Sequence, residues 1–397
     1  MGHGALRSQS VVKIAAATAL AVLLALVAAA SVSARPDEDA VLGPLGMEIA
    51  DIPHPVLGAD GLNHLVYEIR IVNQSGLDVT IDRVQPRAGG GAFGAAVDGA
   101  ALAQILAVNG APGPVIPGGG SAQLFMDVTY PEDEPAPKRL AHGFNLTATD
   151  GVQPEQKINF RGVPTRVSRQ DAIEVAPPLR GPGWVVGNGC CAELNAHRGA
   201  TLSIDGTVHV AERFAIDYVQ LNDAGMLFEG AKGDLANYGY FGAKIHSATD
   251  GKVVRVQDGL PEQTPGALPS GQTVQTAGGN FLVVKADDDH YAFYAHMQPG
   301  SLRFEKGDRV REGQVLGLLG NTGNTDGPHL HFHVMDGPSP LQSNGVPFVH
   351  PSFTGEGTVT NIGPIQDGAT ATIDPDALAG RVRNSMPLNN QVVDFGP

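Results

Sequence analysis

Three runs of alternating apolar and polar residues predict β-strands in the N-terminal half of the chain. They cover residues 65–71, 124–130 and 140–146, and glycine- and proline-rich segments separate them. Side chains two positions apart on a strand point the same way, so the apolar residues of each run would share one face. In the first run these residues are Leu65, Tyr67, Ile69 and Ile71. The pattern is typical of an antiparallel β-sandwich.

The C-terminal half also has the pattern of a β-protein. Short apolar runs at 253–256, 281–284 and 291–294 predict buried strands. Glycines near both ends of residues 307–317 predict a compact hairpin, and an apolar stretch at 392–395 is expected to dock onto a domain. The whole chain is therefore predicted to be all-β.

Composition excludes several classes of protein. Glycine and proline number 52 and 29 among 397 residues, which disfavours a mainly helical bundle because both residues interrupt helices. The formal net charge of −15 argues against a nucleic-acid-binding protein, whose affinity depends on lysine and arginine. Two cysteines do not supply a disulfide framework for a chain of this size.

The first 34 residues have the order of a cleavable signal peptide. Arg7 and Lys13 are followed by small apolar residues from 14 to 30, and Val32-Ser33-Ala34 matches a small-residue cleavage site. A permanent membrane anchor is the alternative, but a run of about 17 residues is short for a span. We predict an exported protein, periplasmic or secreted, with no membrane span once the signal is removed. The remaining patterns divide the chain into a sandwich domain of unassigned role (35–175), a second β-domain (176–352) and a C-terminal extension (353–397).

Histidines alternate in the segment 329–333. On a strand, His329, His331 and His333 would all point to one face, where imidazoles make poor core filler. Neutral imidazole is a common zinc ligand, so the pattern favours a metal site over an exposed histidine-rich strand. His296 ends another predicted strand. Asp217 lies within an apolar run, where a metal ion would compensate its charge.

The order of these segments resembles the lysostaphin-type (LytM-like) zinc metallopeptidases, which cut peptide cross-links of bacterial peptidoglycan. The resemblance runs from about His197 to His350. Its motifs are, in order, Ala215-Ile216-Asp217, Gly242 to Asp250-Gly251, Tyr294-Ala295-His296, Gly313-Gln314 to Gly323, and Gly327-Pro328-His329-Leu330-His331-Phe332.

The resemblance implies that residues 176–352 form a LytM-like β-sheet peptidase domain with a zinc groove. It implies Asp217 and His331 as ligands of Zn²⁺, His296 and His329 as catalytic residues, and peptidoglycan peptides as substrates. Relatives commonly carry an acidic residue at the position of His333, which is assigned no role.

The chain departs from the family at the first zinc ligand. That ligand is a histidine four residues before the aspartate, and here the position holds Arg213, which has no lone pair to offer. Either a histidine from elsewhere reaches the metal or the site is inactive. A hairpin at Asp205-Gly206 would bring His197 back beside residues 213–217, so we favour His197 over His209 as the third ligand.

Other functions compete with the peptidase hypothesis. A non-catalytic LytM-like factor that binds or regulates cell-wall enzymes is one, although such factors typically lose several of the site residues that are present here. The 307–317 segment resembles the hairpin of biotin and lipoyl carriers, but it has no lysine at a comparable tip. The sequence leaves open whether a glycyl or a D-amino-acid cross-link is cut. It also leaves open whether Cys190 and Cys191 form a disulfide, stay free or bind metal.

Overall fold

The structure of the protein is a computed structural model that describes residues 40–191 and 194–397. The predicted signal peptide, 1–34, lies outside the described residues. Strands dominate the described part of the chain and its helices are short, which confirms the predicted all-β class. None of the helices in this part is both long and apolar enough to cross a bilayer.

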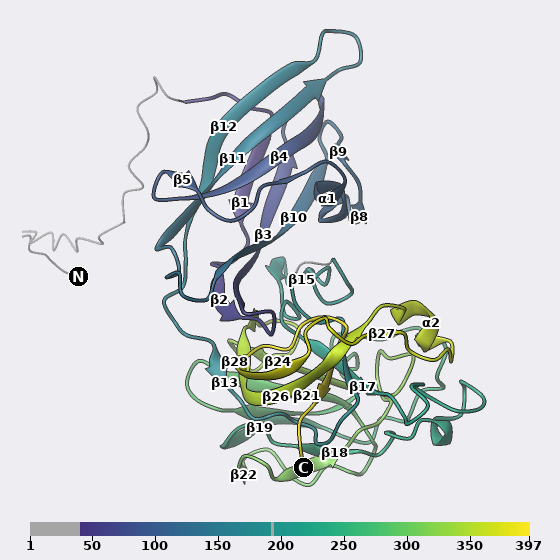
Figure 1. The fold of residues 1–397 in the computed structure, drawn as a ribbon. Helices are drawn as coiled ribbons and strands as arrows, with labels where there is room; N and C mark the ends of the chain where they lie inside the picture. The colour runs from purple at the N-terminus through teal and green to yellow at the C-terminus, as the bar shows by residue number, and fades with distance from the viewer. Residues whose placement is uncertain (1–39, 192–193) are drawn as a thin grey trace, which may run out of the picture. The chain divides into compact units, whose positions relative to one another are not determined.

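Two antiparallel sheets form the N-terminal sandwich (Figure 1). The strands of the first sheet are β1 (Leu45–Ile49), β2 (His54–Leu57), β3 (Leu62–Asn73), β7 (Leu106–Val108), β8 (Ala111–Pro112) and β10 (Ser121–Pro131). Those of the second are β4 (Asp78–Ala88), β5 (Gly91–Ala92), β6 (Val97–Asp98), β9 (Val115–Ile116), β11 (Arg139–Thr149) and β12 (Gln156–Arg166). The short helix α1 (Gly99–Gln104) follows β6. Apolar side chains from both sheets share one core.

The alternation in the sequence is confirmed in these strands. The four apolar residues predicted to share a face of β3 are at most 1% exposed. His142 is a core histidine with partners for both ring nitrogens: its Nε2 lies 2.7 Å from the Tyr67 hydroxyl, and its Nδ1 donates to the Val163 carbonyl. The opposite face of β3 is buried too, because Glu68 is only 1% exposed.

A larger sheet forms the C-terminal part. The order of its main strands is β13 (Ile173–Glu174), β26 (Phe348–Val359), β29 (Gln391–Asp394), β14 (Trp184–Gly187), β17 (Ile216–Gln220), β24 (Leu330–Met335), β21 (Tyr291–Met297), β20 (Asn280–Lys285), β19 (Gly251–Gln257) and β22 (Arg309–Val310). Three side strands are β25 (Gly345–Val346) on β24, and β27 (Ile373–Asp374) and β28 (Gly380–Ser385) on β26. Two small sheets pair β15 (Leu202–Ile204) with β16 (Thr207–His209) and β18 (Lys244–His246) with β23 (Val315–Leu318). The helical turns are η2 (Leu235–Asn237) and α2 (Ile362–Gln366).

The predicted hairpin at 307–317 is wrong. Its two strands, β22 and β23, do not pair with each other, because β22 pairs with β19 and β23 pairs with β18. The glycines at the ends of the segment mark turns, but the strands between them find partners elsewhere in the chain. This removes the structural basis for the comparison with biotin and lipoyl carriers.

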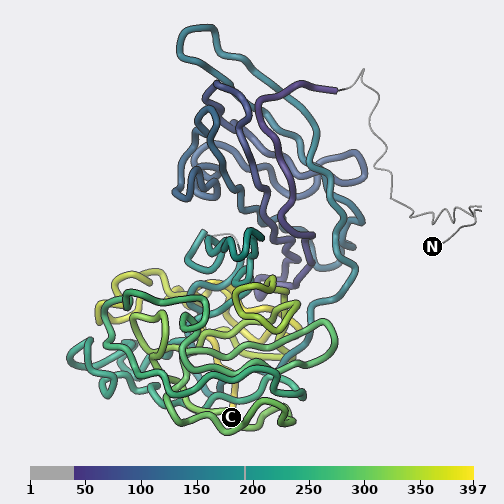
Figure 2. Tube along the Cα trace, turned by 180° about the vertical axis from the view of Figure 1, so that it is seen from behind, coloured from purple at the N-terminus to yellow at the C-terminus, as the bar shows by residue number. Residues whose placement is uncertain are grey.

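The C-terminal extension is part of the large sheet. Its last strand, β29, pairs with β14 on one side and β26 on the other, so the apolar stretch at 392–395 docks as predicted. Val392 and Val393 are at most 2% exposed. In Figure 2 the yellow C-terminal segments run among the green strands of this part of the molecule. The domain boundaries at 35, 176 and 353 remain a prediction.

Candidate metal centre

Two neighbouring strands place Asp217 and His331 together. Asp217 of β17 is directly opposite His331 of β24, and His331 Nδ1 lies 3.0 Å from Asp217 Oδ1. Ile216 and Tyr218, on either side of Asp217, are fully buried in the core. Because side chains alternate along a strand, the burial of these two residues directs the carboxylate to the opposite face. On the other side of β17, Gly187 of β14 lies opposite Asp217. A Cβ at this glycine would come within 2.8 Å of the Asp217 carbonyl oxygen, so the lack of a side chain leaves room for the two strands to pair.

His197 reaches the same carboxylate from an upstream loop. The predicted hairpin is present, with β15 and β16 joined through Asp205 and Gly206, which have positive φ angles of 51° and 79°. His197 Nε2 lies 3.2 Å from Asp217 Oδ2. His209 pairs with Leu202 in the hairpin and belongs to none of the possible metal-binding groups of the described residues.

The loop that carries His197 is held at several points. Asn188 donates from Nδ2 to Asp217 Oδ2 at 2.8 Å, and Asn195 donates to the Gly189 carbonyl at 2.8 Å. Cys190 and Cys191 form a disulfide, so their sulfur atoms are not available as metal ligands. Sequence reasoning missed the role of Asn188, because a lone asparagine in a loop is usually a turn residue.

His296 and His329 complete the site. His296 lies at the end of β21 with a positive φ of 61°, and its ring centroid is 4.5 Å from that of His329. His296 Nδ1 donates to the Thr322 carbonyl at 2.7 Å, and His329 Nδ1 donates to the Gly327 carbonyl at 2.9 Å. His329 Nε2 lies 3.2 Å from Asp217 Oδ1. The structure thus brings together all five residues that the sequence singled out.

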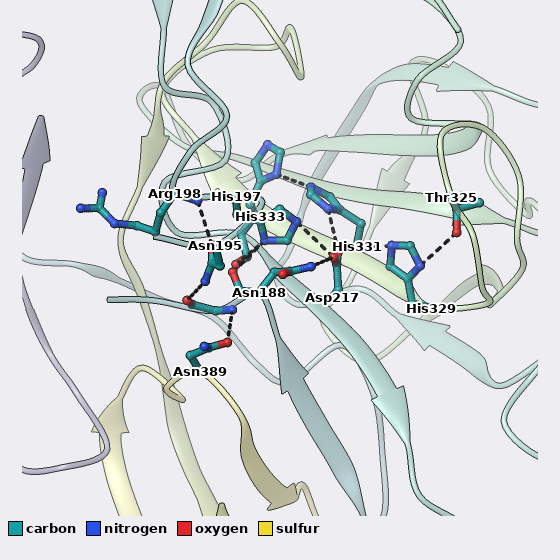
Figure 3. A network of polar contacts seen from close by, with 12 residues as sticks. Asn188, Asn195, His197, Arg198, Asp217, Thr325, His329, His331, His333 and Asn389 are labelled. Atoms are coloured by element: carbon teal, nitrogen blue, oxygen red, sulfur yellow. Dashed lines mark hydrogen bonds and ion pairs between the residues drawn. The ribbon is translucent and has the colours of Figure 1, made fainter. Parts of the chain in front are cut away.

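The hydrogen bonds of the rings fit a cation at Asp217. Figure 3 shows His197, His329 and His331 around this carboxylate. In two of these histidines the ring nitrogen that does not face Asp217 donates to backbone carbonyls: His197 Nδ1 to those of Asn188 and Ala215, and His329 Nδ1 to that of Gly327. In a neutral imidazole the other nitrogen then carries a lone pair. Lone pairs directed at a carboxylate repel it unless a proton or a metal ion lies between them.

The donor set suits zinc. The ligand atoms of His197, Asp217 and His331 all lie within 4.8 Å of one another. Two imidazoles and one carboxylate form a ligand type that catalytic zinc uses, with a fourth position left for water or substrate. The same spacing is found for His296, His329 and His331, but that set has no negative charge to balance the ion.

The charges of the site shift several pKa values. Burial acts to lower the pKa of His197, but the neighbouring Asp217 carboxylate raises it to about 9. Burial opposes ionisation of Asp217, yet His197 and His329 hold its pKa well below the usual range. Burial, together with His329 and His331, keeps the pKa of His296 well below its ordinary value. His296 is therefore neutral near pH 7, and because its Nδ1 donates to the Thr322 carbonyl, its Nε2 carries the lone pair.

His333 orients one of the candidate ligands. It is fully buried, and its Nδ1 lies 2.9 Å from His331 Nε2. When His331 Nδ1 directs its lone pair to a cation at Asp217, His331 Nε2 carries the proton and can donate it to His333 Nδ1, which is the usual task of a group hydrogen-bonded to a metal ligand. The sequence contained the signal, because His331 and His333 were expected on one face of the strand.

Arg213, at the position where the resemblance implies a histidine ligand, takes part in a buried ion pair. It is 2% exposed, and it forms a buried ion pair with Glu68 of β3, with Nε 3.1 Å from Oε2. Arg198, next to His197, forms a second pair with Glu68 at 2.6 Å. Arg213 also pairs with Asp51 at 3.2 Å. This group, which we call the Glu68 cluster, ties the sandwich to both segments that carry candidate ligands.

Glu262 supports the loop that leads to His329. Its Oε2 accepts a hydrogen bond from the Asn321 backbone, and the Thr325 hydroxyl donates to Asn321 Oδ1 at 2.8 Å. Glu262 Oε1 is buried and has no hydrogen-bond partner among the described residues. Burial raises the pKa of this carboxyl to about 7.

Replacing Glu262 with glutamine should stabilise the protein by about 1 kcal/mol near pH 8.5 and change little near pH 5. Because the folded pKa is raised, the carboxyl contributes stability at acidic pH that is lost as pH rises through about 7. Urea unfolding at both pH values measures the effect. Glu305→Gln, which makes the same substitution at an exposed residue, is the control. An equal gain at both pH values would contradict the prediction.

Residues 234–343 match the model described as peptidase family M23. This confirms the resemblance to lysostaphin-type peptidases in the C-terminal half and identifies an M23 peptidase domain there. The matched segment includes His296, His329 and His331, whereas His197 and Asp217 lie upstream of it.

Three named proteins resemble part of the chain. The chain is 35% identical over 101 residues to Endolysin 2638A of Staphylococcus phage 2638A, a match covering 25% of this chain and 20% of the relative. It is 33% identical over 82 residues to the peptidoglycan DD-endopeptidase ShyA of Vibrio cholerae serotype O1, covering 17% and 19%. It is 31% identical over 94 residues to the glycyl-glycine endopeptidase ALE-1 of Staphylococcus capitis, covering 24% and 22%. The chain thus spans about a fifth of the length of these relatives.

Among solved structures, the catalytic domain of lysostaphin from Staphylococcus simulans matches with a TM-score of 0.23 and 21% sequence identity. The match covers 42% of this chain and 88% of that domain.

Proposed function

We propose that this protein is a zinc-dependent metalloendopeptidase that hydrolyses peptide cross-links of bacterial peptidoglycan. The observation that carries the proposal is the convergence of His197 Nε2, Asp217 and His331 Nδ1 beside the ring pair of His296 and His329. The M23 match and the relatives named as peptidoglycan endopeptidases support the substrate class. The predicted export would bring the protein to the compartment that contains this substrate.

His197, Asp217 and His331 would hold the zinc ion. Zinc in such a ligand set is a Lewis acid that polarises a carbonyl group and makes water a nucleophile at neutral pH. Hydrogen bonds within the chain hold these candidate ligands in position. Backbone carbonyls hold the ring of His197, His333 holds the ring of His331, and Asn188 holds one oxygen of Asp217.

His296 and His329 would handle the protons of the reaction. The Nδ1 atom of each ring donates to a backbone carbonyl, which leaves each Nε2 atom to exchange a proton with water or substrate. One ring can accept the proton of the attacking water, and the other can stabilise the developing oxyanion or protonate the leaving amine. The rings are close enough to act on a single peptide bond.

Replacing His296 or His329 with alanine should reduce turnover of peptidoglycan by about 10²- to 10⁴-fold. The zinc content should stay at about one ion per chain. Each substitution removes a proton-transfer group and leaves the proposed ligands in place. Release of soluble muropeptides from purified sacculi measures turnover, and elemental analysis measures zinc. His290→Ala, which changes a histidine outside the site, is the control. Full activity in both site variants would refute these roles.

The proposed function itself is tested by metal removal. Purified full-length protein should contain zinc, lose hydrolysis of sacculi when a chelator removes the metal, and regain it when zinc is restored. A protein that holds zinc yet never hydrolyses sacculi or cross-linked peptides would instead be a non-catalytic factor acting on cell-wall enzymes.

A further inference from the structure

A pocket of about 250 Å³ opens directly beside the candidate metal centre. Asp217 and His329 lie in its wall, so anything bound in the pocket lies next to the groups that would act on a peptide bond. The pocket belongs to the C-terminal part of the molecule, where α2 of the extension lines it together with β17 and the 222–243 loop.

One side of the pocket is apolar and well supported, whereas polar side chains such as Asn188, Asp326 and Asn390 line the rest. Phe228, Tyr238 and Tyr240 come from the loop, and neighbouring rings in this series have centroid distances of 5.0 and 6.0 Å. Ile362 and Ile365 come from α2, and Ile365 is fully buried. Packed aromatic rings and a buried isoleucine give a preformed surface rather than one that must collapse around a ligand.

The charge of the pocket argues against an acidic occupant, because the carboxylates of Asp217 and Asp326 lie in its wall. Lys232 is the one cationic residue among the described lining residues, and its Nζ forms an ion pair of 2.9 Å with Asp367. Because the pair engages this ammonium group, the wall does not offer it to a carboxylate. The ion pair also joins the loop to the extension, as does the hydrogen bond from the Ala371 amide to the Gly225 carbonyl.

The size of the pocket discriminates between cross-links. Cavities of about 150 Å³ bind a benzene ring, so 250 Å³ accommodates a whole side chain. Glycine has no side chain and would leave the apolar wall in contact with water. Burying a leucine-sized side chain favours binding by about tenfold or more.

We propose that this pocket is a specificity subsite for an apolar side chain on a residue next to the scissile bond. The protein then prefers cross-links whose residues carry side chains over glycyl-glycine cross-links. The inference rests on the proposed function for its place in a reaction, but the preference in binding can be measured without turnover.

The test compares matched pentapeptide amides: pentaglycine, and pentaglycine with one leucine of either configuration at the third or fourth position. Binding is measured by calorimetry on the zinc-loaded His296→Ala protein, in which turnover is suppressed, and cleavage is measured on the wild type. At least one leucyl peptide should bind about tenfold or more tightly than pentaglycine and be cut with a correspondingly higher kcat/KM. Equal binding of all peptides, or tighter binding of pentaglycine, would overturn the subsite.

Two substitutions locate the effect. Ile362→Trp should fill the pocket and bring the ratio of leucyl to glycyl binding close to about one, whereas Ala369→Trp, on an exposed residue just beyond α2, should preserve the ratio. Thermal unfolding checks that both variants are folded, and Ile362→Asn is the substitute if the tryptophan variant is not. A ratio unchanged by either change at Ile362 contradicts the proposal. If leucyl peptides bind preferentially but the wild type cuts no peptide or sacculus, the peptidase function fails and the subsite stands.

Discussion

Replacing His197 with alanine should release the metal and abolish hydrolysis. His197 Nε2 is 3.2 Å from Asp217 Oδ2, and its Nδ1 is fixed by two backbone carbonyls. Changing a group that merely orients a ligand typically costs about 10- to 100-fold, so losing a ligand should reduce activity by at least about 100-fold. Zinc content measured by elemental analysis should fall from about one per chain towards zero, and His331→Ala and Asp217→Ala should do the same.

His209→Ala is the matched control for this experiment. His209 lies twelve residues after His197, at the end of the hairpin that β15 and β16 form. It is not part of the possible metal-binding group that contains His197. Its zinc content and activity should equal those of the wild type. If His209→Ala loses zinc and His197→Ala retains it, our assignment of the third ligand is wrong. Circular dichroism of each variant confirms that the fold is intact.

Replacing Glu68 with glutamine should destabilise the protein by about 3–5 kcal/mol. Glu68 is buried between Arg198 and Arg213, and these two guanidinium groups hold its pKa below the usual range although burial opposes its charge. Removing the carboxylate leaves two buried cations with little compensation, which is among the costlier single changes in a protein. Urea unfolding at neutral pH measures the loss.

A control and a compensating variant make this prediction specific. Glu48→Gln removes an exposed ion pair with Arg70 on the neighbouring strand and should change stability by less than about 1 kcal/mol. Replacing Glu68, Arg198 and Arg213 together with methionine should recover most of the stability, since an apolar group can replace a buried ion cluster. A glutamine variant as stable as the wild type would show that the Glu68 cluster contributes nothing.

The sequence predicted the sandwich because its strands have one clear apolar face. Leu65 and its partners on β3 lie in the core where the alternation placed them. It wrongly predicted that β22 and β23 pair with each other, because glycines show where turns occur but not which strands meet after them. Pairing depends on contacts between distant segments, and a local pattern does not specify these.

The candidate site was predictable where its residues lie in short motifs. Asp217, His296, His329 and His331 come together as their order suggested, and the turn at Asp205 and Gly206 was sufficient to favour His197. The functions of these residues remain predictions.

The ion pair formed by Arg213 could not be predicted from the residues next to it in the sequence. Its partner, Glu68, lies 145 positions away on β3. The alternation that predicted this strand comes from the apolar residues on its opposite face. The pocket beside the candidate metal centre could not be predicted for the same reason, because α2 and the 222–243 loop are distant in sequence.

The position of β29 has a consequence for how the chain folds. A nascent chain that has emerged only to residue 350 already contains every candidate ligand, yet the edge of β14 that faces β29 has no partner. Unpaired strand edges are templates for aggregation. Residues 391–394 must therefore be present before the sheet beneath the histidines is closed, and truncations that remove them would be expected to yield insoluble protein.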